Sequence, residues 1–239
     1  MTEISKEINL LYQDEYLVAV NKPSGVLSQP NPGKESESIL SLVKEMGINL
    51  IGGDDPARHG LIHRLDRDTS GVLLLSLSNE SHEKFQSLFK KRSIKKVYRF
   101  PAFGRLKRME FTRKDPLGRH PVKRTTQQVD PEGRDAETYF KLIKMGLPNY
   151  SFWEAQPKTG RTHQIRVHAQ AGGLTILGDP NYGKQYQINK NKELNLTHTM
   201  LHCKSLEFIH PFTEEKILVQ SQYPKDFTDC LSALNLSID

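Results

Sequence analysis

The chain has 239 residues, of which 36% are hydrophobic and 26% are charged, and its formal net charge is +6. This is the composition of an ordinary soluble globular protein with a sizeable core. Apolar runs of about 18 residues are absent, which excludes a membrane span, and the first residues lack the order of a secretory signal. Two cysteines without a CxxC pair exclude a disulfide framework and give no zinc signal, so we expect a reducing, cytoplasmic compartment.

The N-terminal half predicts two strands and two helices. "YLVAVNKPSG" is typical of a buried strand that ends in a turn, and "GVLLLSLS" of a central strand. "ESESILSLVKEMG" has apolar residues at helical spacing and a glycine stop. "NESHEKFQSLFKKRS" predicts a helix capped by Asn79, with acids at its start and bases at its end.

After residue 95 the pattern is mostly strands and turns. Strands are expected in "KKVYRFPAFG", "AETYFKLIKM", "SFWEAQP", "SLEFIHP" and "KILVQSQYP", whereas "KQYQINKNKELNLTH" is expected to be a loop. Strands outnumber helices without regular β-α alternation. We therefore predict an α+β fold on a mixed, mainly antiparallel sheet, forming a single domain over residues 1–239.

Positive charge is concentrated in one segment. Residues 90–114 hold eleven Lys and Arg against a single acid, Glu110, so the rest of the chain is net negative. Such an excess attracts polyanions, although a solvated basic face is the plainer interpretation. Tyr98, Phe100 and Phe103 lie among these charges, and that mixture favours nucleic acid.

Four charges also crowd into "HRLDRDTSG", residues 63–71, directly before the central strand. On an extended backbone Arg64, Asp66 and Asp68 share a face. They form either a surface ion-pair ladder, which contributes little stability, or a polar site with a carboxylate between guanidinium groups. The spacing alone leaves both open.

A second cluster is "PKTGRTHQIRVHA", residues 157–169. On an extended backbone Arg161 and His163 face one way, and Arg166 and His168 the other, so the two histidines do not share a metal. Better-spaced histidine pairs have no obvious third ligand; they are His59 with His63 and His198 with His202. The sequence therefore gives no metal site.

Taken together, these motifs resemble the RluA-type RNA pseudouridine synthases. The segments that carry the resemblance are "LLYQDEYLVAVNKPSG", "HRLDRDTSG", "KVY", "TGRTHQIRVH", "GDPNYG" and "LHCKSLEFIHP", in order over residues 10–224. The resemblance implies an α+β catalytic domain with a central RNA-binding cleft. It also implies isomerisation of a uridine in structured rRNA or tRNA to pseudouridine, with base flipping and without metal or other cofactor. A missing Gly-rich phosphate loop agrees with this.

The resemblance also implies roles for individual residues. Asp66 matches the catalytic aspartate, which acts as nucleophile or base, and Arg166 matches the arginine that pairs with it. Tyr98 matches a tyrosine expected to stack on the uracil. Arg64 is expected to enter the RNA helix when the nucleotide flips out, and Leu201 to line the base pocket.

The sequence departs from the family pattern at two places. Phe100 and Pro101 follow the tyrosine where a small residue is usual, and Leu174 and Thr175 stand where His-Pro is common. Both departures concern substrate shape rather than the reaction. The resemblance starts near residue 10, so we expect a stand-alone catalytic domain without the small N-terminal S4-like module. RNA binding then falls to the basic segment 90–124 and its neighbourhood, with these residues foremost: Lys95, Lys96, Arg99 and Arg161.

Two rival functions remain. One is a catalytically silent RNA-binding or RNA-folding protein on the same scaffold, which would not need Asp66. The other is a metal hydrolase, which would lose activity in chelator. Neither the RNA nor the modified uridine follows from the sequence, since RNA shape decides both; for the oligomeric state we take a monomer as the default.

Overall fold

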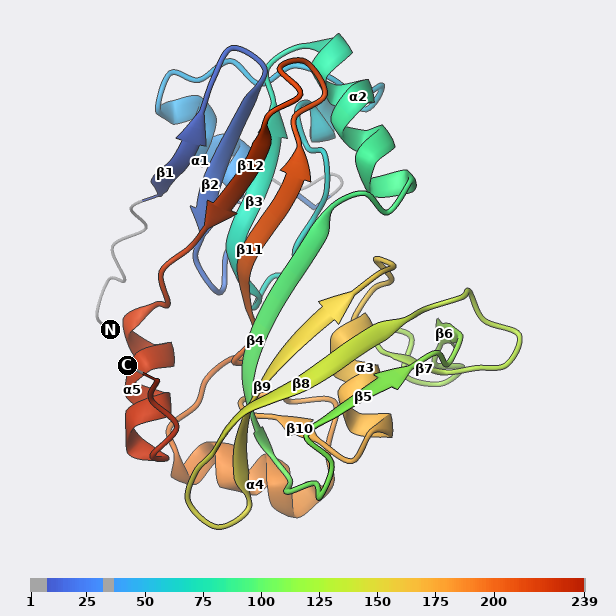
Figure 1. The fold of residues 1–239 in the computed structure, drawn as a ribbon, viewed down its shortest axis with the longest axis vertical. Coiled ribbons are helices and arrows are strands. Elements are labelled where there is room, and N and C mark those ends of the chain that lie inside the picture. The colour runs from blue at the N-terminus through green and yellow to red at the C-terminus, as the bar shows by residue number, and fades with distance from the viewer. Residues whose placement is uncertain (1–7, 32–36, 239) are drawn as a thin grey trace. The chain divides into compact units, whose positions relative to one another are not determined.

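The computed structural model describes residues 8–31 and 37–238. They form two compact units. Unit 1 comprises Met1–Lys95 and Cys203–Gln222, and unit 2 comprises Lys96–His202 and Tyr223–Asp239. Each unit thus combines two separate stretches of chain, which Figure 1 colours by residue number.

Unit 1 is built on a sheet with the neighbour order β1-β2-β3-β11 and with β12 paired to β11. Its strands are β1 (Asn9–Gln13), β2 (Leu17–Lys22), β3 (Ser70–Ser76), β11 (His202–Ile209) and β12 (Lys216–Gln220). The β1–β2, β2–β3 and β11–β12 pairs are antiparallel. Figure 1 draws β3 and β11 pointing the same way, so this sheet is mixed.

The centre of unit 1 is the pair β2 and β3. Leu17 to Val20 are fully buried, and so is every residue of β3. Strands buried on both faces become continuous apolar runs, which is why "LVAV" and "GVLLL" show no alternation. Phe85 of α2 packs edge-on against Phe208 of β11 and closes one side of this core.

The helices of unit 1 are α1 (Ile39–Glu45), a short 3-10 helix, η1 (Pro56–Arg58), and α2 (Asn79–Lys90). The cap of α2 corrects the sequence prediction: Ser78, not Asn79, is the N-cap. Its hydroxyl accepts a hydrogen bond from the Ser81 backbone N–H, and the Ser81 hydroxyl accepts one from the Ser78 backbone N–H. Two serines three residues apart thus form a capping box, in which the second serine takes the place of the usual Glu or Gln.

Unit 2 is built on an antiparallel sheet in the order β4-β9-β8-β5, with β10 paired to β4, and a separate β6–β7 hairpin. Its strands are β4 (Lys95–Phe103), β5 (Glu110–Arg113), β6 (Leu117–Arg119), β7 (Gln127–Val129), β8 (Thr138–Met145), β9 (Tyr150–Pro157) and β10 (Thr175–Ile176).

Alternate residues of this sheet serve two apolar cores. Phe100, Trp153 and Phe140 belong to one core, together with Ile165 of α3. Phe152 belongs to the other, which α5 covers with the following apolar residues: Phe227, Cys230 and Leu231. Because successive side chains of a strand point to opposite faces, both faces of this sheet are apolar, and each is covered by a helix.

The helices of unit 2 are α3 (Gln164–Ala171), α4 (Gln185–Glu193) and α5 (Lys225–Ala233). One sequence prediction was wrong here, and one assumed conformation does not occur. The polar segment 184–198, expected to be a loop, forms α4, where buried Gln187 and Asn191 bond to neighbouring segments. The segment 164–169, considered as extended, lies in α3. Tertiary hydrogen bonds, which a hydrophobic pattern does not record, stabilise α4.

The helices and the mixed, mainly antiparallel strands confirm the α+β fold class. Cys203 and Cys230 are both buried and free. Within the described parts of the chain, every helix is too short or too polar to cross a bilayer.

Candidate active site

Asp66 lies in a turn that precedes β3. The backbone N–H of Thr69 donates to the Asp66 carbonyl at 3.1 Å, so residues 66–69 bend rather than continue as a strand. The extended backbone on which Arg64, Asp66 and Asp68 would share a face is therefore interrupted by a turn that starts at Asp66. Leu65 is buried and anchors the turn, Arg64 beside it is exposed, and Asp66 is half-buried.

The "KPSG" turn after β2 and the nearby Ser28 hold the Asp66 turn, mainly through its backbone carbonyls. The Ser28 hydroxyl donates to the Leu65 carbonyl at 2.8 Å and accepts from the Leu65 N–H at 3.1 Å. The Ser24 hydroxyl donates to the Asp68 carbonyl at 2.8 Å. Gly25 N–H donates to the Arg67 carbonyl, and Arg67 Nε returns a bond to the Gly25 carbonyl, both at 3.0 Å. Two motifs about 40 residues apart thus form one rigid structure.

Lys22 lies fully buried at the centre of this structure. Its Nζ donates to the carbonyls of Pro23, Val26 and Arg67 at 2.8, 2.6 and 2.8 Å. Burial lowers the pKa of Lys22 to about 7, against an opposing effect of the Asp68 and Asp66 carboxylates. Lys22 therefore bonds the "KPSG" turn to the Asp66 turn through a buried amine.

In unit 2, Tyr98 and Leu201 belong to one apolar surface. Tyr98 on β4 is half-buried and packs against the core cluster that contains Leu201 and Ile165. Tyr98 pairs with Ala155 of β9, and Phe100 pairs with Trp153. Phe100 is fully buried in the same cluster, so its bulk fills the core rather than the surface.

Arg166 is placed by the start of α3. At the first residue of the helix, Gln164 Oε1 accepts hydrogen bonds from the Thr159 hydroxyl and the Arg161 N–H at 2.7 and 2.9 Å. His163 takes a left-handed φ of 54°, which turns the chain into the helix. Arg166 then reaches Asp179, with Nε to Oδ2 at 2.7 Å and Nη2 to Oδ1 at 2.9 Å. Within its own unit, the carboxylate partner of Arg166 is Asp179; its predicted pairing with Asp66 stays a prediction.

The candidate RNA-binding residues differ in their surroundings. Lys95 is exposed on β4. Lys96 donates to the Thr159 carbonyl at 3.1 Å, and Arg161 Nε donates to the Asp135 carbonyl at 3.0 Å. Arg99 Nη1 donates to the Tyr223 hydroxyl at 2.9 Å, and Nη2 lies 3.5 Å from Glu154. Of the four, Lys95 is thus the most accessible to a ligand.

The histidines have structural partners. His168 is fully buried; its Nδ1 bonds to the Thr138 hydroxyl and its Nε2 to the Asp115 carbonyl, each at 2.9 Å. Burial lowers the pKa of His168 and so favours the neutral ring. His63 Nε2 accepts from the Leu74 N–H at 3.0 Å. Across the described residues, no three His, Cys, Asp or Glu side chains are grouped so that they could hold a metal ion.

No motif in the sequence predicts a role for Lys22 or Asp179. The sequence contains one feature that could have pointed to Lys22: it is a lysine at the end of a buried strand, next to a proline. Asp179 and Tyr182 lie in the quoted "GDPNYG" segment, where a single acid among turn residues looks like an ordinary turn. Only the buried hydrogen bonds of Lys22, Asp179 and Tyr182 show which groups these residues position.

Comparison with known proteins supports the resemblance. A family model described as RNA pseudouridylate synthase matches residues 16–171. The chain is 34% identical over 232 residues to the ribosomal large subunit pseudouridine synthase D of Buchnera aphidicola, covering 94% of this chain and 72% of that protein. It is 32% identical over 234 residues to an uncharacterized RNA pseudouridine synthase of Synechocystis, covering 97% and 70%.

Solved structures show the same fold. Human RNA pseudouridylate synthase domain containing 1 superposes with a TM-score of 0.76 at 22% identity, over 100% of this chain and 99% of that chain. Human RNA pseudouridylate synthase domain containing 4 gives a TM-score of 0.76 at 23% identity, over 96% and 94%. At such identities the likeness supports the fold.

Proposed function

We propose that this chain, which belongs to the RNA pseudouridylate synthase family, modifies uridine in ribosomal RNA with Asp66 as its catalytic carboxylate. Family membership makes the chain an isomerase that converts uridine in RNA to pseudouridine. The N1–C1′ bond breaks and a C5–C1′ bond forms, while one proton leaves C5 and one binds N1. No atoms are gained or lost, and no oxidant or reductant is required.

The observation that carries the assignment to Asp66 is the construction of its turn. Hydrogen bonds from the "KPSG" segment fix the backbone carbonyls of residues 67 and 68, and the Ser28 hydroxyl fixes that of residue 65, so that carbonyls on either side of Asp66 are held. A carboxylate that attacks a sugar carbon or takes a proton must be held close to one geometry. A surface ion-pair ladder would not need a turn fixed in this way.

Further roles in the same reaction fall to residues of unit 2 and to Arg64 of unit 1. Tyr98 presents its ring beside the apolar cluster that includes Leu201, a surface suited to a uracil. Arg166 is proposed as the guanidinium partner of the catalytic carboxylate, as the family resemblance implies. Arg64, exposed beside Leu65, takes the space that the flipped nucleotide leaves in the RNA.

We further propose that the substrate is ribosomal RNA and that the enzyme works as a cytoplasmic monomer. Several relatives are named ribosomal large subunit pseudouridine synthase D. The basic residues that start at Lys90 supply attraction to RNA phosphates, and Lys95 at the start of β4 is among the exposed ones. Mapping pseudouridines in ribosomal and transfer RNA, with and without the gene, tests the substrate. Loss confined to transfer RNA would overturn the ribosomal assignment.

The role of Asp66 is tested by release of tritium from RNA that contains 5-tritiated uridine. The wild-type protein should release tritium in the presence of chelator. Asp66→Asn should lower the rate by at least about 10⁴-fold, as loss of a covalent nucleophile does, while RNA affinity stays within about threefold.

Asp68→Asn is the matched control. It removes a carboxylate two residues away in the same turn and should retain most of the activity. An active Asp66→Asn enzyme would refute the assignment, and loss of wild-type activity in chelator would favour a metal hydrolase. Full cellular function of the Asp66 variant would favour a silent RNA-binding protein.

A further inference from the structure

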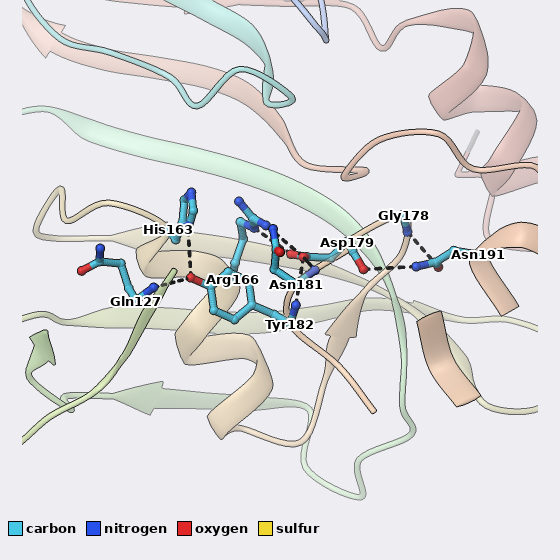
Figure 2. A network of polar contacts seen from close by, with 8 residues as sticks. All are labelled: Gln127, His163, Arg166, Gly178, Asp179, Asn181, Tyr182 and Asn191. Atoms are coloured by element: carbon cyan, nitrogen blue, oxygen red, sulfur yellow. Dashed lines mark hydrogen bonds and ion pairs between the residues drawn. The ribbon is translucent and has the colours of Figure 1, made fainter. Parts of the chain in front are cut away.

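The Asp179 carboxylate holds the guanidinium of Arg166 in its plane. Arg166 Nε and Nη2 donate to the two oxygens of Asp179 at 2.7 and 2.9 Å, as Figure 2 shows. Asp179 is fully buried and the Arg166 side chain is 7% exposed. A two-bond fork between planar groups fixes direction as well as distance. The Nη1 edge of Arg166 is thus oriented by Asp179 without being occupied by it.

Tyr182 supports the same group from a second direction. The Cζ atom of Arg166 lies 4.8 Å from the centroid of the Tyr182 ring. Guanidinium groups are attracted to the face of an aromatic ring. Tyr182 is itself buried: its hydroxyl accepts from the Gln127 N–H of β7 at 2.7 Å and bonds to His163 Nδ1 at 2.8 Å. The ring therefore has a fixed position from which to contact Arg166.

The turn around Asp179 is built to aim its carboxylate. Asp179 Oδ1 accepts from the N–H groups of Asn181 and Tyr182 at 2.9 and 3.1 Å. Asn191 of α4 accepts from the Gly178 N–H at 2.9 Å and donates to the Asp179 carbonyl at 3.3 Å. Figure 2 shows these bonds on both sides of Asp179. These bonds orient the Asp179 carboxylate independently of Arg166.

We infer that Asp179 is a positioning residue for Arg166, and that Tyr182 is its second support. Stability alone gives no reason for an ion pair here, since well-packed apolar residues often stabilise a core at least as well. The need for a fixed guanidinium direction does give a reason for this ion pair. The inference rests on the proposed role of Arg166 in the reaction, and Asp179 acts through Arg166 without touching the RNA.

The first test is Asp179→Asn. Asparagine keeps an oxygen for the N–H groups of Asn181 and Tyr182, but its Nδ2 turns a donor toward a donor of Arg166. Misplacing a catalytic group by about 1 Å costs about 100-fold in rate, so kcat should fall about 100-fold while KM changes little. Asp229→Asn is the control: it removes an exposed carboxylate paired with Lys225 on α5 and should leave kcat unchanged.

A double-mutant cycle separates positioning from general structural damage. If Asp179 acts through Arg166, adding Asp179→Asn to Arg166→Ala should cause no further loss of kcat. Losses that multiply would overturn the inference, because Asp179 would then act independently.

A readout without turnover distinguishes the two proposals. The Arg166 Nε–H resonance, assigned by its absence in Arg166→Lys, should exchange slowly with water in the wild type and rapidly in Asp179→Asn. If Arg166→Ala is fully active, the proposed role of Arg166 fails, yet slow exchange that depends on Asp179 still supports positioning. Exchange that is unchanged in Asp179→Asn overturns it.

If Asp179→Asn does not fold, the inference is tested with variants of Tyr182 instead. Tyr182→Leu should speed Nε–H exchange of Arg166 and lower kcat about tenfold, whereas Tyr182→Phe, which keeps the ring, should retain most of the activity. Wild-type exchange and kcat in Tyr182→Leu would overturn the inference.

Discussion

Replacing Lys22 with methionine should change the pH dependence of stability in a defined direction. Methionine keeps an unbranched chain of similar length but removes the amine. Three carbonyls, those of Pro23, Val26 and Arg67, then lose their donor. Leaving such buried acceptors unpaired costs about 1–3 kcal/mol of unfolding free energy. We therefore expect Lys22→Met to be less stable than the wild type at pH 9.

The size of the pH effect follows from the pKa of Lys22, which burial lowers from 10.5 to about 7. Between these values the unfolded chain binds a proton that the folded protein does not. Wild-type stability therefore rises with pH in this window, by about 1.4 kcal/mol per pH unit. From pH 7 to pH 9 the gain is about 2–3 kcal/mol. Lys22→Met lacks this gain, so its deficit should shrink as the pH falls to 7.

The measurement is urea unfolding of both proteins at pH 7, 8 and 9. Subtracting the two free energies cancels every other titrating group. Lys225→Met, which removes an amine that is 86% exposed, should show no pH-dependent difference. A wild-type advantage over Lys22→Met that is constant within about 0.5 kcal/mol from pH 7 to pH 9 would refute the lowered pKa.

Three more predictions concern local structure. Ser78→Ala should lower the unfolding free energy by about 1 kcal/mol because it removes the cap of α2; Asn79→Ala should have little effect, and the reverse order in urea unfolding would restore Asn79 as the cap. Gly71→Ala should destabilise by about 2–3 kcal/mol, because φ is +110° and a Cβ would lie 2.2 Å from the Cys203 carbonyl oxygen; an unchanged melting temperature would contradict this. Burial raises the pKa of the Cys230 thiol to about 12, so iodoacetamide at pH 8 should label it only after unfolding, and fast labelling of the native protein would show the thiol to be accessible.

Much of the fold followed from local pattern. The buried strands β2 and β3 appear as apolar runs, and the amphipathic helix α2 appears in the spacing of its apolar residues. The polar helix α4 did not, because two buried amides stabilise it through bonds to other segments. The local pattern also does not predict the turn at Asp66, because hydrogen bonds from a turn distant in the sequence hold it.

The sequence by itself determined the family, the reaction and the identity of the candidate residues, because ordered motifs retain the residue types that the chemistry requires. Only the tertiary structure showed which buried groups hold these candidate residues in position. Lys22 and Asp179 looked like a strand end and a turn residue, and each proved to be a buried charge bonded to a candidate site residue or its turn. Burial makes such contacts strong, and burial depends on segments that meet only when the chain is folded.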